Sequence, residues 1–208
     1  MIKILAYVLM VLAHIGYVYY PDSEFLLVIG RLAFPLFAWG ISQGFTQTSN
    51  FKQYSIRILV IAILSQYPYY LVFGNGYLNV CFTLFVGLLV LKVYELKINV
   101  PTKILLLMLF FVITDIVNLE YGMYGIALIL AFHIFGISTI GVIVQIIITL
   151  LGIYLYHYNP LQIFSVFSFI LIILLKNYNF RINYYLNYVF YPVHIVIIYI
   201  SMYYYDIL

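Results

Sequence analysis

Two polar side chains that could do chemistry lie in otherwise apolar stretches near the start of the chain. His14 falls within the apolar run at about 2–20, and Arg31 falls within the next run, at about 25–45. An imidazole can act as a general base, and a guanidinium can stabilise an oxyanion or hold a phosphate or carboxylate. Because an arginine inside a bilayer costs about 2.5–3.5 kcal/mol on insertion scales, we expect Arg31 to have a function there.

A third candidate, His194, lies in the last apolar run, at about 183–205. Four polar residues of this run are spaced to share one face of a helix, namely Asn187, Tyr191, His194 and Ser201. Pro192 frees backbone groups and kinks the helix beside the histidine. We therefore expect His14, Arg31 and His194 to lie at one polar site that has a function.

The composition places these residues in a membrane protein. Hydrophobic residues make up 67% of the 208 residues and charged residues only 7%, in apolar runs that repeat from end to end. A helix needs about 20 residues to cross a bilayer, which leaves room for eight to nine crossings and no soluble domain. We predict a single all-α transmembrane domain over residues 1–208, a polytopic helix bundle of about nine spans.

The expected spans are separated by clusters of Pro, Gly, Asn, Asp and Ser. They cover roughly 2–20, 25–45, 54–73, 79–96, 103–118, 122–136, 138–157, 160–176 and 183–205. The single cysteine, Cys81, excludes an intrachain disulfide, and the net charge of +3 gives no indication of nucleic-acid binding.

Charge placement predicts the orientation of the bundle. If the amino terminus is cytoplasmic, every basic residue except Arg31 falls in the inner connections, and all acidic residues except Glu95 fall on the outer side. Inner connections of membrane proteins carry an excess of Lys and Arg. We therefore expect a cytoplasmic amino terminus and an extracytoplasmic carboxyl terminus.

In this orientation several polar residues reach a similar depth in the outer half of the bundle. They are His14, Arg31, Ser65, Gln66, Asn79, Thr83, Asp115 and Tyr121. Polar groups in lipid have to face one another or a wet cavity, so we expect an outward-facing polar chamber. Taken singly, Gln66 and Asn79 are each expected to form ordinary interhelical hydrogen bonds.

Other chemistries fit the residues less well. His14, His194 and Asp115 could be imagined around a metal, but no span carries the i, i+4 His/Glu pair that usually anchors one, so we expect no metal. Cys81 has no base near it in sequence, which disfavours it as a nucleophile.

Six sequence blocks, in order, resemble the TraX family of membrane proteins, typified by the pilin amino-terminal acetylase, and more distantly the multi-span acyltransferases. The blocks are 10–16, 30–38, 65–70, 78–84, 120–125 and 191–194. The resemblance covers about residues 1 to 204 and implies transfer of an acyl group, usually acetyl from acetyl-CoA, to an amine or hydroxyl. The implied acceptor is a peptide, lipid or glycan at the outer face of the bacterial cytoplasmic (inner) membrane, with a pilin-like peptide amino terminus favoured.

The resemblance also suggests roles for individual residues. In the implied catalytic centre of His14, Arg31 and His194, His14 would take the acceptor's proton, with His194 as the second candidate base. Arg31 would stabilise the oxyanion or hold a substrate anion. The residues expected to bind the acceptor are Gln66, Tyr69, Asn79, Thr83, Asp115, Tyr121 and Tyr191. Lys52 and Arg57 would attract the phosphates of acetyl-CoA from the cytosol.

One position departs from the family pattern, which normally has an acid directly before the histidine, where this chain has Ala13. Arg31 then needs another counter-charge, for which Asp115 and Glu120 are available on the outer side. The sequence leaves open whether Ala13 is natural or an introduced substitution, and whether the chain is an active, weakened or inactive enzyme. The alternative function is a non-catalytic binding or immunity-type membrane protein that keeps the chamber as a docking site.

Overall fold

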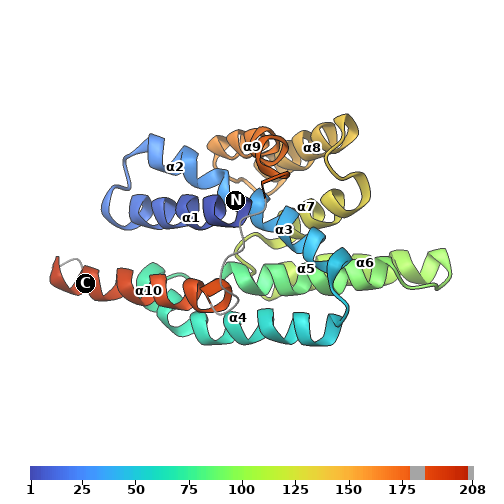
Figure 1. Cartoon of the computed structure of the whole chain (residues 1–208), viewed down its shortest axis with the longest axis horizontal. Coiled ribbons are helices and arrows are strands. Elements are labelled where there is room, and N and C mark those ends of the chain that lie inside the picture. Colours follow the sequence, from blue (N-terminus) through green and yellow to red (C-terminus); the bar gives the residue numbers. More distant parts are fainter. Residues whose placement is uncertain (179–185, 206–208) are drawn as a thin grey trace.

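The computed structural model describes residues 1–178 and 186–205, which fold almost entirely into helices (Figure 1). These are α1 (Ile2–Tyr19), α2 (Glu24–Arg31), α3 (Ala33–Gln47), α4 (Phe51–Phe73), α5 (Val80–Tyr94), α6 (Val100–Ile116), α7 (Gly122–Phe135), α8 (Thr139–Leu155), the 3-10 helix η1 (Pro160–Phe167), α9 (Ser168–Leu175) and α10 (Leu186–Tyr204). The described residues contain no β-strand, so the expected all-α class is confirmed for them. Arg181 and Asp206, which contributed to the predicted orientation, lie outside the described residues.

The helix boundaries follow the turn residues of the sequence. Five helices begin after a side chain whose oxygen accepts a hydrogen bond from a backbone N–H of the first turn, namely Asn50, Asn79, Asn99, Ser138 and Asn159. Two of the predicted segments are subdivided: the second into α2 and α3, which meet at Leu32, and the eighth into η1 and α9.

Three helical segments are long and apolar enough to cross a membrane, namely Ile2–Tyr19, Glu24–Gln47 and Phe51–Phe73. Shorter apolar helices cover Val80–Tyr94, Gly122–Phe135, Thr139–Leu155 and Pro160–Leu175. A 15-residue helix rises about 22 Å, which is less than the ~30 Å hydrocarbon core of a typical bilayer. The chain is thus a membrane-associated helical protein, and the number of nine spans stays a prediction.

Basic residues gather at one end of the bundle, where α1, α4 and α6 begin and α3, α5 and α7 end. There the Lys92 ammonium lies 5.5 Å from the centre of the Phe51 ring, and His133 Nε2 lies 2.8 Å from the Glu95 carboxylate. We call this the basic end. Arg31 is the one basic residue of the described part of the chain at the opposite end.

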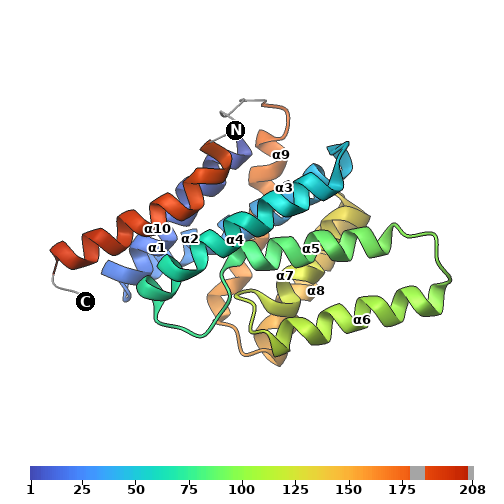
Figure 2. The ribbon, with the colours of Figure 1, turned by 90° about the horizontal axis from the view of Figure 1, so that it is seen from below.

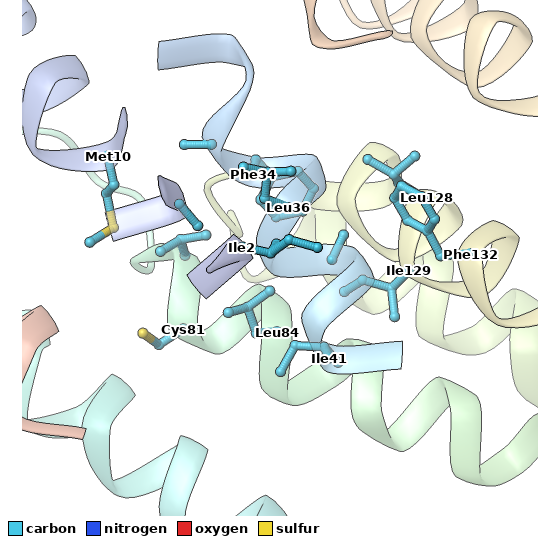
Figure 3. Close-up of a cluster of buried hydrophobic side chains, with 14 of the residues drawn as sticks. Ile2, Met10, Phe34, Leu36, Ile41, Cys81, Leu84, Leu128, Ile129 and Phe132 are labelled. Carbon is cyan, nitrogen blue, oxygen red and sulfur yellow. The ribbon is translucent and has the colours of Figure 1, made fainter. Parts of the chain in front are cut away.

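The helices lie in two groups with α1, α3 and α7 between them. Figure 1 shows α10, α4, α5 and α6 along one side, and α2, α8 and α9 along the other. The middle helix α3 packs against α1, α5 and α7, whereas α10 packs mainly against α4 (Figure 2). Figure 3 shows the apolar cluster around α3, in which Phe34, Leu36 and Ile41 are buried together with Leu84 of α5 and Ile129 of α7.

Helices α1 and α10 run in the same direction and are joined by polar side chains. The three pairs, in order from the basic end, are Tyr7 with Asn187, His14 with His194, and Tyr19 with Ser201. Asn187, His194 and Ser201 therefore share one face of α10, as their spacing predicted. Since backbones in neighbouring helices of a bundle usually approach through apolar or small side chains, this polar seam is an unusual contact.

A stability difference between two helical glycines tests this packing. A methyl group at Gly125 would lie only 2.6 Å from Thr83 Cγ2, 2.8 Å from Tyr121 Cβ and 2.9 Å from Phe34 Cζ. We expect Gly125→Ala to lower the free energy of unfolding by about 1–3 kcal/mol through overpacking. Gly40→Ala meets no atom within 4 Å and should be neutral or stabilising by up to ~1 kcal/mol. Thermal unfolding in detergent measures both, and equal midpoints would contradict the packing.

Candidate active site

Arg31 is the last residue of α2, at a break in the helix that has a clear cause. Pro35 has no N–H to donate to the Arg31 carbonyl, so the regular helix cannot continue through this turn. The Leu32 N–H instead bonds to the Ile29 carbonyl at 3.1 Å, and α3 begins at Ala33. The break turns the Arg31 side chain into the bundle, where its Nε is buried without a hydrogen-bond partner.

Glu120 is fixed opposite by the connection between α6 and α7. Its N–H bonds to the Leu78 carbonyl at 3.0 Å, and the Leu78 N–H bonds to the Asn118 carbonyl at 2.9 Å, so two connections form a short β-bridge. The left-handed backbone of Asn118 (φ 50°) and Gly122 (φ 41°) allows the tight turn on either side of the glutamate. One carboxylate oxygen, Oε2, is buried without a hydrogen-bond partner.

Both charged side chains line one small cavity, of about 140 Å³. Its lining residues are Arg31, Glu120, Tyr121, Tyr124, Tyr158, Asn159 and Gln162. Burial raises the pKa of Glu120 to about 7, an effect that the Val80 N–H, the Tyr69 hydroxyl and the Arg31 charge partly offset. Of the two acids proposed as counter-charges, Glu120 is therefore the one in the site, whereas Asp115 is exposed outside the cavity.

The two candidate histidines form a hydrogen-bonded pair. His14 Nδ1 lies 3.0 Å from His194 Nε2, and His194 Nδ1 lies 3.0 Å from the Phe190 carbonyl oxygen. A carbonyl only accepts, so His194 Nδ1 carries a proton, and the neutral ring keeps a lone pair on Nε2. The hydrogen-bond pattern then assigns the proton of His14 to Nδ1. His14 Nε2 is left with a lone pair and no hydrogen-bond partner among the described residues.

Tyr191 lies between the histidine pair and the charged cavity. Its ring centre is 5.2 Å from that of His194, and its buried hydroxyl, which has no hydrogen-bond partner, is close enough to Glu120 for electrostatic interaction. It also lines a second, larger cavity.

The larger cavity, of about 570 Å³, lies between α1, α3, α4 and α10 and extends from the basic end to the middle of the bundle. Lys3 and Lys176 line it at the basic end, and Met10, Cys81 and Tyr191 line its inner part. Met10 is one helical turn from His14. The cavity therefore leads from the basic end to within a turn of the histidine pair.

Comparison with known proteins identifies the family. The sequence pattern of the TraX protein family matches residues 1–201, which is nearly the whole chain. The chain belongs to the TraX family. It is 30% identical over 123 residues to the probable fimbrial assembly protein FimC, serogroup H1, of Dichelobacter nodosus, covering 51% of this chain and 50% of that protein. It is 40% identical over 73 residues to protein TraX of Escherichia coli, covering 34% of this chain and 29% of that protein.

In these matches the TraX-family chain spans half of the first relative and less than a third of the second. No solved structure gives a significant match. Among residues 1–178 and 186–205, no group of three or more His, Cys, Asp and Glu side chains is placed to hold a metal ion.

Several predicted site residues of the TraX-family chain have structural partners outside both cavities. Gln66 Oε1 accepts hydrogen bonds from the Asn79 N–H at 3.0 Å and from Asn79 Nδ2 at 2.9 Å, which ties α4 to the start of α5. Asn79 also caps α5 through the Cys81 N–H at 3.0 Å. Thr83 is buried against Gly125, and Tyr69 is buried beside Glu120. Gln66 and Asn79 thus make the interhelical hydrogen bonds expected of each taken singly.

The predicted basic residues lie next to the large cavity. Lys52 is exposed, and the Arg57 guanidinium lies 5.6 Å from the ring centre of Tyr188, which lines the cavity. Lys3 and Lys176 line it directly, and sequence reasoning did not distinguish them from the other basic residues of that end. It also missed Tyr124, Tyr158, Asn159 and Gln162 of the small cavity.

Ala13 of the TraX-family chain faces α2 and is turned away from His194. A methyl group at Gly30 would lie 2.6 Å from Ala13 Cβ, so the two helices are in close contact at this position. A side chain at position 13 therefore points toward the Gly30–Arg31 turn. A carboxylate at position 13 would therefore lie closer to Arg31 than to the far side of His14, and it would pair with the guanidinium and not orient the imidazole.

The pKa of Glu120 gives a measurable pH dependence. Its folded value of about 7 exceeds its ordinary 4.5, so the protonated acid favours the fold. That stabilisation is fully present below about pH 4.5 and is lost as the pH rises through about 7. The infrared C=O band of the protonated acid, identified by difference from Glu120→Gln, should titrate with a midpoint near 7. Arg31→Gln should raise the midpoint and Lys97→Gln leave it unchanged; a midpoint near 4.5 would contradict the burial.

The tautomer of His14 is the second measurable property of the site. With both imidazoles neutral, ¹⁵N NMR should show that His14 is protonated at Nδ1 and unprotonated at Nε2. His194→Phe removes the acceptor and should release His14 from this single tautomer, whereas His194→Gln offers an amide oxygen and should preserve it. Protonation of native His14 at Nε2 would contradict the assignment.

Proposed function

We propose that this chain is a membrane-embedded acyltransferase that moves an acetyl group from acetyl-CoA to an amine or hydroxyl of an extracytoplasmic acceptor, with a peptide amino terminus favoured. The single observation that carries the proposal is the position of Tyr191. It lines the large cavity, contacts His194 and interacts with Glu120 of the small cavity. Tyr191 would thus lie between the two cavities, a position that suits a transfer between two substrates.

The donor would enter from the basic end. With the amino terminus in the cytosol of a bacterial inner membrane, the large cavity opens to the compartment that holds acetyl-CoA. Lys3 and Lys176 at its mouth suit the phosphates of CoA, with Lys52 and Arg57 adding to the positive field. The inner part of the cavity, near Met10 and Tyr191, would receive the thioester.

The acceptor would enter from the opposite end, through the small cavity. Its amine nitrogen attacks the acetyl carbonyl carbon, and His14 Nε2 takes the proton that the nitrogen loses. The proton on His14 Nδ1 stays shared with His194 Nε2, which disperses the charge over two rings. The C–S bond then breaks, and the thiolate of CoA takes the proton back from His14. Tyr191 and Arg31 would be the donors that stabilise the oxyanion.

The fimbrial role in one relative's name supports a pilin-like acceptor, since fimbriae are assembled from such subunits. Glu120 supports an active enzyme, because it provides a carboxylate near Arg31 although position 13 carries no acid.

The assay that tests the proposal is labelled acetyl transfer to peptides in membranes that contain the chain. His14→Gln should lower the rate by about 10²–10⁴-fold, the usual contribution of a general base. His157→Gln, an exposed histidine in the connection between α8 and η1, is the matched control and should keep the native rate. Absence of transfer by the native chain, with the peptide bound, would overturn the enzyme in favour of a binding protein.

A further inference from the structure

Arg31 and Glu120 face one cavity but do not pair with each other. Their charged atoms do not come within the 4.0 Å of an ion pair, although the guanidinium is near enough to lower the pKa of the carboxyl. Arg31 Nε and Glu120 Oε2 are both buried and unpartnered. Opposite charges in a medium of low dielectric attract strongly, and leaving each unpaired is costly. The backbone holds the two groups apart, so a ligand with both charges can satisfy both.

The walls of the cavity match such a ligand. Tyr121, Tyr124 and Tyr158 surround it with aromatic rings, which favour a cation beside a carboxylate. A guanidinium binds a carboxylate or phosphate in a planar, bidentate manner. The volume of about 140 Å³ suits one terminal residue and a short side chain.

We propose that the small cavity binds the amino terminus of a peptide whose first or second residue is acidic, with the ammonium against Glu120 and the acidic side chain against Arg31. This deepens the proposed function, on which it rests, by naming the class of acceptor. The acceptor is recognised by two charges a few bonds apart, and an amine alone is a poor ligand.

The mouth of the cavity favours a peptide over a lipid headgroup. Asn159, in the connection between α8 and η1, is the exposed member of the lining. None of the exposed large apolar side chains, such as Phe25, Ile116 or Phe164, lines the cavity. A diacyl lipid would need an apolar opening for its tails, whereas a peptide chain leaves through a polar mouth.

Charge recognition also accounts for the protons of the reaction. The bound ammonium gives one proton to the Glu120 carboxylate, which leaves a neutral amine and a carboxylic acid. The amine attacks the acetyl carbon, and its second proton goes to His14 Nε2 as described. The product amide has no charge to pair with Glu120, so the acetylated peptide binds more weakly than the substrate.

Binding measurements without any acyl donor test the inference apart from catalysis. The full chain in phosphatidylcholine nanodiscs is titrated with glycyl-aspartyl amide, glycyl-asparaginyl amide and N-acetylglycyl-aspartyl amide. We expect the first to bind at least ten-fold tighter than either of the others, which corresponds to about 1.4 kcal/mol. Arg31→Gln should abolish the preference for the aspartyl peptide over the asparaginyl peptide. Glu120→Gln should abolish the preference for the peptide with a free amine over the acetylated one. Asp22→Asn, an exposed carboxylate of the same end, should keep both preferences.

Equal binding of the three peptides by the native chain overturns the inference. The titrations of the native chain test the inference by themselves, even where a variant fails to fold. Tighter binding of O-phosphoethanolamine than of any peptide also overturns it, in favour of a lipid headgroup. Acetyl transfer without these preferences refutes the charge recognition but leaves the proposed function. Charge preferences without transfer refute the enzyme but leave the binding site.

Discussion

Two opposite charges held apart inside a helix bundle are the constraint on which the rest of the structure depends. Arg31 is fixed by a helix break that Pro35 enforces, and Glu120 by a β-bridge to Leu78 between two connections. These hydrogen bonds hold both backbones in place. Tight packing of Gly125 against three neighbouring side chains supports the same region. The site is therefore preorganised by the scaffold, and its charges remain available to a ligand.

The sequence predicted those features that depend on local chemistry. Helices begin after Asn50 and Asn99 because these side chains accept hydrogen bonds from free N–H groups of the first turn, and the residue type alone predicts such a helix start. The seven-residue spacing of His194 and Ser201 placed them on one face of a helix. Arg31 was identified by its cost in lipid, which does not depend on knowing its neighbours.

The sequence could not predict which helices meet. Asp115, in the last turn of α6, and Glu120, in the connection that follows, are five residues apart, and only the turn between them decides that Glu120 enters the cavity while Asp115 stays exposed. Likewise, Lys3 and Lys52 have the same charge at the same end, and only the packing of α1 against α3 brings Lys3 to the cavity. Periodicity gives the face of a helix, whereas a site depends on the helix opposite.

The polar seam between α1 and α10 has a mechanical consequence. The large cavity lies between these two helices, so an occupant that spreads them lengthens the contact between His14 and His194, and one that draws them together shortens it. Slippage of either helix by a single turn would break the Tyr7–Asn187 and Tyr19–Ser201 contacts at the same time. The two outer contacts thus keep the register that places the central imidazoles of His14 and His194 side by side.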